Sequence, residues 1–350
     1  MKKDGSISND QEYKAREIHD KAIVIEGLVY RCGGYDDAAM EGGLTAVHTT
    51  VCPFQAGFRE ALDYIAKTLA RFEGTGDKWM VARTTSDILK AKREGKVSII
   101  LGSQNAKPIE DNLDNLYLFR RLGLRIIQIT YNDRNFVGDG CLERTNAGLS
   151  RFGVSLVKAM NKLGILIDLS HVGERTTMDA IEHSEAPVVF THANPRALSE
   201  NPRNKSDEQI KAMAKRGGVM GISAYGPICW DEKKGIPPTM DDVVAHIDYV
   251  VNLIGVDHVG LGNDFPMGVP RPIVDQIINT TNANYPQMSG EYNRIVGSGY
   301  DQRYAKGFES LAKFPNVTRA LVQRGYSAED ISKILGGNFL RVFKEVWKGE

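Results

Sequence analysis

Residues 166–198 read LIDLSHVGERTTMDAIEHSEAPVVFTHANPRAL, and this stretch indicates the fold. Two short β-prone runs, Leu166–Leu169 and Val188–Phe190, are each followed by a histidine, His171 and His192. Between them, Glu174–His183 has a helical pattern. A strand, a helix and a second strand, with a polar side chain after each strand, form the repeating unit of an α/β barrel. Two imidazoles at neighbouring strand ends can share one metal ion.

Eight apolar runs fit the strands of such a barrel, and most of them are separated by helical patterns. Several are rich in valine and isoleucine and do not alternate, as expected of parallel strands that are buried on both faces. The sequence therefore predicts a (β/α)8 TIM barrel. The runs are Ile23–Leu28, Leu44–Val51, Val97–Leu101, Ile126–Thr130, Leu166–Leu169, Val188–Phe190, Val219–Ala224 and His258–Leu261. The predicted helices are Phe58–Phe72, Thr85–Gly95, Asn112–Leu122, Ser150–Leu163, Glu174–His183, Ser206–Arg216 and Met240–Ile254.

The whole chain, residues 1–350, is predicted to form this one barrel domain. Residues 1–22 are a helical lead-in, and a Gly-rich loop, Arg31–Gly43, joins the first two strands without an obvious helix. The polar segment after the eighth strand, residues 265–305, is too long for an ordinary βα loop, so we expect a long loop or a cap over the site. Residues 306–350 form a C-terminal helical extension with two helices, Asn316–Gln323 and Ser327–Leu335.

Composition and charge argue against several functional classes. The chain is 42% hydrophobic and 25% charged, as is ordinary for a globular protein, and its net charge is zero. No basic stripe suggests a nucleic-acid partner. No apolar run approaches the roughly 20 residues that span a bilayer, and the N-terminus lacks the apolar core of a secretory signal. The four cysteines have no CxxC spacing, so we expect a cytoplasmic protein without a membrane partner.

Polar side chains follow most of the predicted strands, and in a barrel the chemistry lies at these C-terminal strand ends. Arg203, in the loop after the sixth strand, is well placed to meet an anionic group. The strand-end positions are Leu28, Tyr30, His48, Gln104, Tyr131, Asn132, His171, His192 and Asp264.

Six motifs together resemble the renal or membrane dipeptidase family, peptidase family M19, whose members are amidohydrolase-like metallo-hydrolases. The resemblance runs from about Ile23 to Phe343. The motifs are IDLSH (Ile167–His171), THANPRAL (Thr191–Leu198), RNKSDE (Arg203–Glu208), QITYNDRN (Gln128–Asn135), GLGNDF (Gly260–Phe265) and GGNFLRVF (Gly336–Phe343).

The resemblance implies a TIM barrel whose family site holds two zinc ions bridged by a glutamate after strand three. One zinc takes a His-x-Asp pair after strand one, and the other takes the histidines of strands five and six. An aspartate after strand eight assists the attacking hydroxide, while a histidine after strand four and an arginine after strand six hold the substrate. His171 and His192 match the two-histidine half, Asp264 matches the aspartate, and Arg203 matches the arginine.

The chain departs from the family pattern in the other half of the site. The His-x-Asp pair reads Leu28-Val29-Tyr30, the bridging glutamate is Gln104, and the strand-four histidine is Tyr131. Leu28 cannot bind a metal, and a neutral tyrosine is a poor replacement for a carboxylate. Gln104 offers only a neutral carbonyl oxygen. A normal binuclear zinc centre is therefore not expected.

At most one zinc per chain is expected, with His171 and His192 as ligands. Asp264 and the Gln104 oxygen are alternative third ligands, because two histidines and a carboxylate form a known catalytic zinc set. Asp264 is also the candidate general base and then the proton donor to the leaving amine. Arg203 is expected to bind a substrate carboxylate. The alternative to metal binding is that both histidines are structural residues held by hydrogen bonds.

Other positions have supporting or open roles. Tyr131 and Asn132 are expected to line the substrate pocket. Glu26 lies where the family has a supporting aspartate, so we expect it to act behind the ligands. His48 points inward or outward according to a register that the sequence does not fix, so it either replaces a lost ligand or is structural. Cys141 fits a free loop cysteine better than a nucleophile.

The sequence thus predicts a dipeptidase-like hydrolase that cleaves an amide or peptide bond in a small substrate bearing a carboxylate. Family resemblance suggests a homodimer. Two alternatives stay open. One is a lyase, dehydratase or decarboxylase reaction on the same barrel, with Asp264 abstracting a proton and one metal or none. The other is a catalytically silent binding barrel that kept the pocket.

Overall fold

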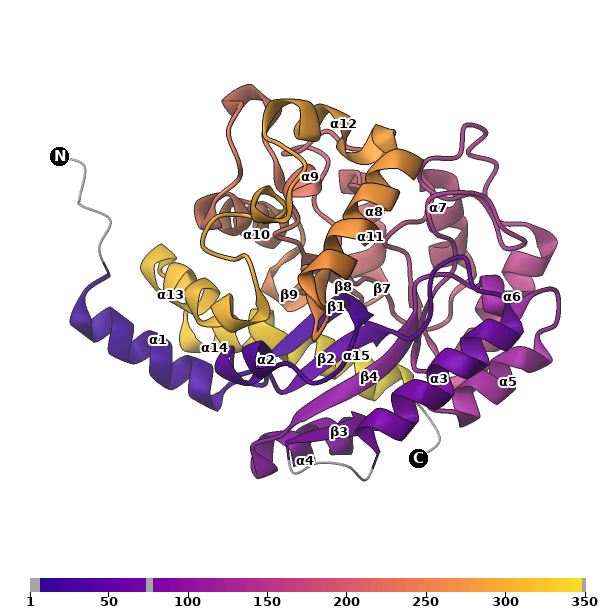
Figure 1. Cartoon of the computed structure of the whole chain (residues 1–350), viewed down its shortest axis with the longest axis horizontal. Helices are drawn as coiled ribbons and strands as arrows, with labels where there is room; N and C mark the ends of the chain where they lie inside the picture. The colour runs from indigo at the N-terminus through magenta and orange to yellow at the C-terminus, as the bar shows by residue number, and fades with distance from the viewer. Residues whose placement is uncertain (1–6, 74–77, 348–350) are drawn as a thin grey trace.

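The computed structural model describes residues 7–73 and 78–347, in which parallel strands curl into a TIM-barrel-like sheet surrounded by helices (Figure 1). The strand order is β10-β1-β2-β4-β5-β6-β7-β8-β9, and β3 pairs with β4 outside this path. The predicted α/β barrel class is confirmed. The strands are β1 Ile25–Cys32, β2 Ala46–Thr50, β3 Trp79–Ala82, β4 Val97–Ser103, β5 Ile126–Gln128, β6 Leu166–Asp168, β7 Val188–Phe190, β8 Val219–Ile222, β9 Val259–Leu261 and β10 Phe265–Met267.

The last strand of the barrel is divided into two pieces, and this division closes the barrel. β9 pairs with β8, whereas β10 pairs in parallel with β1. Between the two pieces, the Asp264 backbone N–H donates to the Leu28 carbonyl at 3.0 Å. Gly262 packs so closely here that a Cβ would lie 1.8 Å from the Thr191 carbonyl oxygen. The bend between β9 and β10 therefore places Asp264 at the mouth of the barrel.

Two strands, β3 and β10, were not predicted, although each of the eight apolar runs overlaps an observed strand. β3 pairs with the first half of β4, from Trp79 against Val97 to Ala82 against Ile100. β5 pairs with the end of the same strand, at Gly102 and Ser103. β3 is thus an addition at the bottom of the barrel, and it does not change the order of the eight predicted strands.

Helices follow most strands and cover the outside of the sheet. The Gly-rich stretch between the first two predicted strands contains the short helix α2, which was not predicted. The polar segment after β10 forms two helices, α11 and α12, in place of a long loop. The helices are α1 Asn9–Lys21, α2 Asp37–Glu41, α3 Phe58–Phe72, α4 Thr85–Glu94, α5 Asp114–Arg121, α6 Arg151–Leu163, α7 Glu174–His183, α8 Asp207–Lys215, α9 Gly226–Cys229, α10 Met240–Ile254, α11 Arg271–Asn284, α12 Pro286–Ile295, α13 Phe314–Arg324, α14 Ala328–Ser332 and α15 Asn338–Val346.

The two ends of the barrel are closed in different ways. The unpredicted α15 packs its apolar face, with Phe339 and Phe343, against a buried layer of strand residues that includes Ile25 and Leu166. These strand residues lie at the N-terminal ends, so α15 plugs the bottom. At the opposite end α11 and α12 lie over the strands and contribute side chains to a cavity (Figure 1). The N-terminal end of the barrel is therefore filled with packed apolar side chains, and the C-terminal end contains a cavity that can hold a ligand.

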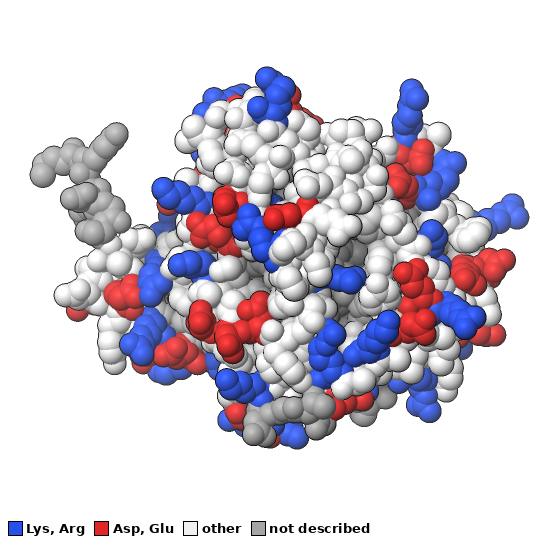
Figure 2. Space-filling view, in the orientation of Figure 1, with Lys and Arg blue, Asp and Glu red and all other residues white. Residues whose placement is uncertain are grey.

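Charges of both signs are mixed around the rim of the face shown in Figure 2, in keeping with the zero net charge. The surface over the upper part of α11 and α12 is mostly uncharged in this view. No helix in the described ranges is long and apolar enough to cross a membrane.

Candidate active site

A cavity of about 350 Å³ lies at the C-terminal ends of the strands, beneath α11 and α12. This volume is in the range of small-molecule sites. Most of the predicted site residues meet here. The strand-end residues that line it include Tyr30, Thr50, Gln104, Tyr131, His171, Arg203, Tyr225 and Asp264, while the cap contributes Ile273, Ile277, Thr280, Met288 and Arg303.

His171 and His192 face each other across neighbouring strand ends, with 3.0 Å between their Nε2 atoms. His171 Nδ1 lies 2.7 Å from the Asn132 side-chain oxygen, which can only accept, so this nitrogen carries a proton. His192 Nδ1 lies 2.8 Å from the Thr191 hydroxyl. The same hydroxyl donates its own proton to Asp168 at 2.6 Å, so it accepts from His192. Both imidazoles therefore carry their proton on Nδ1.

The unprotonated Nε2 atoms of His171 and His192 consequently face each other, and both side chains are buried. Burial lowers the pKa of His171 well below its usual range, and the positive charges of Arg203 and Lys205 lower it further. Burial and Arg203 do the same for the pKa of His192. Both rings are thus neutral near pH 7. Two nitrogens on one tetrahedral zinc, at about 2.0–2.1 Å each, would lie roughly 3.3 Å apart. The pair fits a single divalent cation.

The opposite side of the cavity lacks such ligands. Leu28 is fully buried and does not line the cavity, and the Tyr30 hydroxyl is buried without a partner among the described residues. Burial raises the Tyr30 pKa, so its phenol stays protonated. Gln104 lines the cavity, with its backbone tied to Thr50 and Gln128. The side chains on this side of the cavity therefore do not offer the ligands of a zinc ion. Among the described residues no group of three His, Cys, Asp or Glu side chains is placed to hold a metal, so Asp264 does not join His171 and His192 as the expected third ligand.

Asp264 presents a half-buried carboxylate to the cavity, and no other side chain forms an ion pair with it. Its backbone has the left-handed φ of 60°, and its carbonyl accepts from the Tyr304 hydroxyl at 2.7 Å. The Oδ1 atom is buried without a hydrogen-bond partner among the described residues. Burial raises the pKa of Asp264 to about 6, against the opposing effect of Arg303 and Arg203. A carboxyl group with this pKa is suited to general base and acid work near neutral pH.

Glu26 holds the backbone beside Asp264 in place. Its carboxylate accepts from the Asn263 backbone at 2.6 Å and from the Asn263 side chain at 2.8 Å. It also accepts from the Leu28 N–H at 2.9 Å. Burial raises the pKa of Glu26 to about 7 despite these hydrogen bonds. It is not exposed to the cavity, so it positions the residue that precedes Asp264 without touching a ligand.

Arg203 lies beside the histidine pair and is only 2% exposed. Its guanidinium donates to the carbonyl of His192 at 2.6 Å and to the carbonyl of Ser170. It therefore clamps the ends of β6 and β7 together. The guanidinium also lines the cavity, and two of its five N–H groups account for these bonds, so donors remain for an anion.

Tyr131 and Asn132 bracket the ring of His171. Tyr131 stacks on this ring at 4.0 Å and on Phe54 at 4.0 Å, in a three-ring layer at the cavity wall. Asn132, with a left-handed φ of 57°, accepts from His171 and contacts the Met288 sulfur through its amide nitrogen at 3.2 Å. Tyr131 lines the cavity, whereas Asn132 orients a histidine from behind.

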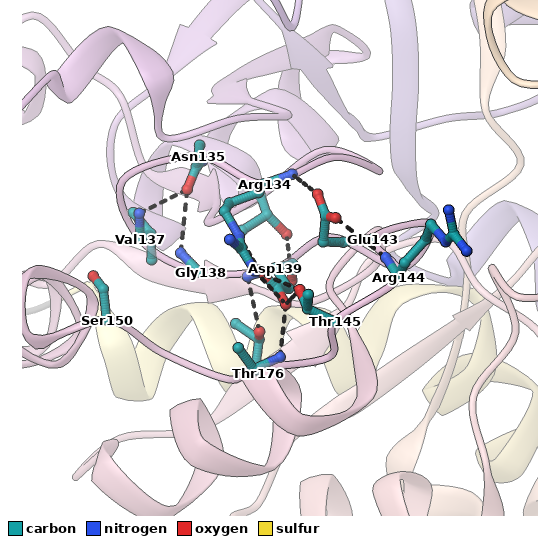
Figure 3. Close-up of polar contacts among 12 residues, drawn as sticks. Arg134, Asn135, Val137, Gly138, Asp139, Glu143, Arg144, Thr145, Ser150 and Thr176 are labelled. Carbon is teal, nitrogen blue, oxygen red and sulfur yellow. Dashed lines mark hydrogen bonds and ion pairs between the residues drawn. The ribbon is translucent and has the colours of Figure 1, made fainter.

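The loop that follows these two residues is ordered by Asp139. The Asp139 carboxylate accepts hydrogen bonds from Arg134 Nε at 2.6 Å and from the Thr145 hydroxyl at 2.8 Å (Figure 3). The Ala147 backbone N–H donates to the same carboxylate at 2.6 Å. Burial alone would raise the Asp139 pKa, but these donors hold it below its usual range. These contacts hold the two ends of the loop, Arg134 and Ala147, against one carboxylate.

His48 and Cys141 do not line the cavity. His48 Nδ1 donates to the Gly27 carbonyl at 2.6 Å, and its Nε2 is buried without a partner among the described residues. A Cβ at Gly102 would lie 2.0 Å from this Nε2, so glycine makes room for the ring inside the barrel. The Cys141 thiol lies 3.4 Å from the Asn132 oxygen, and burial raises its pKa, which does not favour a nucleophilic thiolate.

Sequence reasoning missed Arg303, which comes from the cap segment and lines the cavity. It is only 7% exposed, and its Nε has no hydrogen-bond partner among the described residues. The charge lies over aromatic rings, 4.7 Å from the centre of Tyr225 and 5.9 Å from that of Tyr30. Its position in a polar segment between helices gave no strand-end signal.

Known proteins resemble the chain along most of its length. A family profile described as membrane dipeptidase, peptidase family M19, matches residues 37–279 and 293–349. A crystallised amidohydrolase from Pseudomonas aeruginosa is 36% identical, with a TM-score of 0.85 over 95% of this chain and 99% of that one. A Rhodobacter sphaeroides metallopeptidase, crystallised with a phosphinate mimic of L-Ala-D-Ala, is 20% identical and shares the fold, with a TM-score of 0.76 over 93% of this chain and 100% of that one.

Two curated fungal dipeptidases are also similar. Dipeptidase tcpJ of Claviceps purpurea is 30% identical over 294 residues, which are 83% of this chain and 61% of that protein. Dipeptidase verJ of Clonostachys rogersoniana is 30% identical over 292 residues, or 82% of this chain and 64% of that protein. The chain thus spans less than two thirds of the length of these relatives. Together with the profile match, these similarities show that the chain belongs to the membrane dipeptidase family, peptidase family M19.

Proposed function

We propose that the protein hydrolyses an amide or peptide bond in a small substrate that bears a carboxylate, with one zinc ion held by His171 and His192. The observation that carries this proposal is the pair of Nε2 lone pairs 3.0 Å apart. Without a cation between them the two lone pairs repel, and burial prevents water from screening them. A dipeptidase-family barrel that keeps this arrangement is best explained by a bound metal.

Zinc would supply Lewis-acid activation of water and of the scissile carbonyl. Asp264 accepts a proton from the attacking water as the new C–O bond forms. It then returns this proton to the leaving nitrogen as the C–N bond breaks. Because the pKa of Asp264 is about 6, the carboxylate is mostly ionised at pH 7 and still a usable acid once protonated.

The substrate would be held from two sides. Arg203 offers its remaining N–H groups to a carboxylate next to the histidines. Tyr131, stacked on His171, forms an aromatic wall against which the substrate backbone can lie. The cap helices α11 and α12 reduce the access of bulk water, which strengthens the electrostatic contacts inside the cavity.

Metal analysis together with a dipeptide screen tests the proposal. The full chain, purified and equilibrated with zinc and then desalted, should hold about one zinc per chain and release amino acids from some dipeptides. The screen should include D-residues at the C-terminal position. Two zinc ions per chain would contradict the claim that the residues on the β1–β4 side of the cavity do not bind zinc. One zinc without turnover of any dipeptide would contradict the hydrolase and favour a binding barrel. Turnover without zinc would contradict the metal role.

A further inference from the structure

Arg303 is a buried cation that forms no ion pair with a carboxylate in the described parts of the chain, although the charge of Asp264 acts on it from a distance. Its Nε makes no hydrogen bond there. The rings of Tyr225 and Tyr30 offer partial compensation, because a guanidinium is attracted to an aromatic face. Buried charges are ordinarily paired or bound to a ligand, so an unpaired one that faces a cavity calls for an anion there.

The charges around the cavity have the same implication. Three arginines line it, Arg31, Arg203 and Arg303, against a single carboxylate, Asp264. Asp264 does not form an ion pair with either buried arginine, and its Oδ1 stays unbonded. Because the net charge of the whole chain is zero, this excess of positive charge is a local feature of the cavity. These four side chains give the cavity an excess of two positive charges.

The two buried arginines differ in what they already hold. Arg203 spends two N–H groups on the carbonyls of Ser170 and His192, so it is fixed beside the histidine pair. Arg303 comes from the cap segment, and its guanidinium lies over the rings of Tyr30 and Tyr225. A substrate with a single carboxylate would place it at Arg203. Arg303 would then have no counter-ion in the occupied cavity. A single negative charge therefore does not satisfy this cavity.

We propose that Arg303 binds a second negatively charged group, so that the preferred substrate is an acidic dipeptide with an aspartate or glutamate side chain. This inference rests on the proposed hydrolase function and names its substrate class. The terminal carboxylate lies at Arg203, and the side-chain carboxylate makes charge-assisted hydrogen bonds with Arg303. Arg31, half-buried and over the Tyr64 ring at 5.3 Å, adds positive potential near the cavity.

Kinetics with charge-matched substrates test the proposal. The zinc-loaded full chain is assayed with alanyl-glutamate and alanyl-glutamine, each with an L- or a D-residue at the C-terminus. These two dipeptides have nearly the same size and differ by one charge. We expect kcat/KM at least about tenfold higher for the glutamate substrate. Arg303→Met should bring the ratio close to one, mainly by raising KM for alanyl-glutamate, and Arg303→Lys should retain part of the preference.

Arg271→Met is the matched control. Arg271 belongs to the same cap, and its guanidinium lies over the Tyr300 ring at 4.5 Å, but it pairs with Asp275 and does not line the cavity. This variant should keep the wild-type ratio. Thermal melting of all three variants shows whether any loss reflects unfolding.

A binding measurement separates this inference from the hydrolase proposal. Calorimetry compares glutarate, a dicarboxylate, with butyrate, a monocarboxylate of similar chain length. Glutarate binding that is lost in Arg303→Met would support the second anion site even if no dipeptide were cleaved. Dipeptide hydrolysis without a preference for glutamate, and with equal weak binding of both acids, would overturn the inference and leave the hydrolase intact. An equal loss on both dipeptides in a folded Arg303→Met would also overturn it.

Discussion

The two sides of one cavity offer different chemical groups. On the β6–β7 side, His171 and His192 are fixed by hydrogen bonds to Asn132 and Thr191, which leave both Nε2 atoms bare. On the β1–β4 side, leucine, tyrosine and glutamine occupy the corresponding strand ends, and none of them offers an anionic ligand at neutral pH. If zinc binds as proposed, the residues behind the two histidines matter to the site as much as the histidines do, because they fix the tautomer and orientation of each ring.

Removing one histidine should produce the largest effect, because the β6–β7 side has only two nitrogen ligands. His171→Ala is expected to lower bound zinc from about one per chain to near zero and to bring hydrolysis to background. Elemental analysis after desalting and a dipeptide assay measure both quantities. His183→Ala, at the end of α7, is the control and should retain zinc. Retention of a full equivalent by His171→Ala would place the metal elsewhere.

Asp264→Asn should lower kcat by about 10²–10⁴-fold, because it removes the proton acceptor while asparagine tolerates the left-handed backbone. In the wild type, kcat/KM should rise as pH increases through about 6 and level off above it, since Asp264 must lose its proton to act as a base. The variant should lose this limb of the pH profile. Asp275→Asn, on the exposed face of α11, is the control. An unchanged profile in Asp264→Asn would assign the base to another group.

Asn132→Gly should weaken zinc binding by about 10–100-fold, since the ring of His171 loses the acceptor that fixes its tautomer. Glycine is chosen because position 132 has a positive φ. Asn146→Gly, at another asparagine with a positive φ in the same loop, is the matched control. Competition with a chromogenic chelator gives both dissociation constants. Equal affinities in the two variants would show that Asn132 does not support the ligand.

Leu28→Ala should have the smallest effect on the metal site, although it replaces a residue at a position where the family has a ligand. Because Leu28 is fully buried, the change should lower the free energy of unfolding by about 2–5 kcal/mol. Zinc stoichiometry should not change. Urea denaturation and elemental analysis measure the two quantities, and exposed Leu89→Ala serves as the control. A loss of zinc in a folded Leu28→Ala would mean that the β1 side still takes part in binding.

The histidine pair could be predicted because short β-prone runs end two residues before His171 and His192, and parallel strands bring their ends together. The protonation pattern could not, because it depends on Asn132 and Asp168, which only the folded chain brings near these rings. Arg303 gave no signal, since the polar segment around it contains no strand. The amphipathic pattern of α15 is visible in the sequence, with Phe339, Val342 and Phe343 on one face, but α15 begins beyond the two helices predicted for the C-terminal extension.

The hydrogen bonds between Glu26 and Asn263 have a consequence for the order in which the chain folds. They join residues 237 positions apart, at the seam where the first and last strands of the barrel meet. Contacts of such sequence separation form late, because a long loop must close first. Asp264, the next residue, cannot reach its place before the seam forms. A chain that has built its helices but not its seam is therefore inactive, and in refolding, activity should lag behind the far-ultraviolet circular dichroism signal.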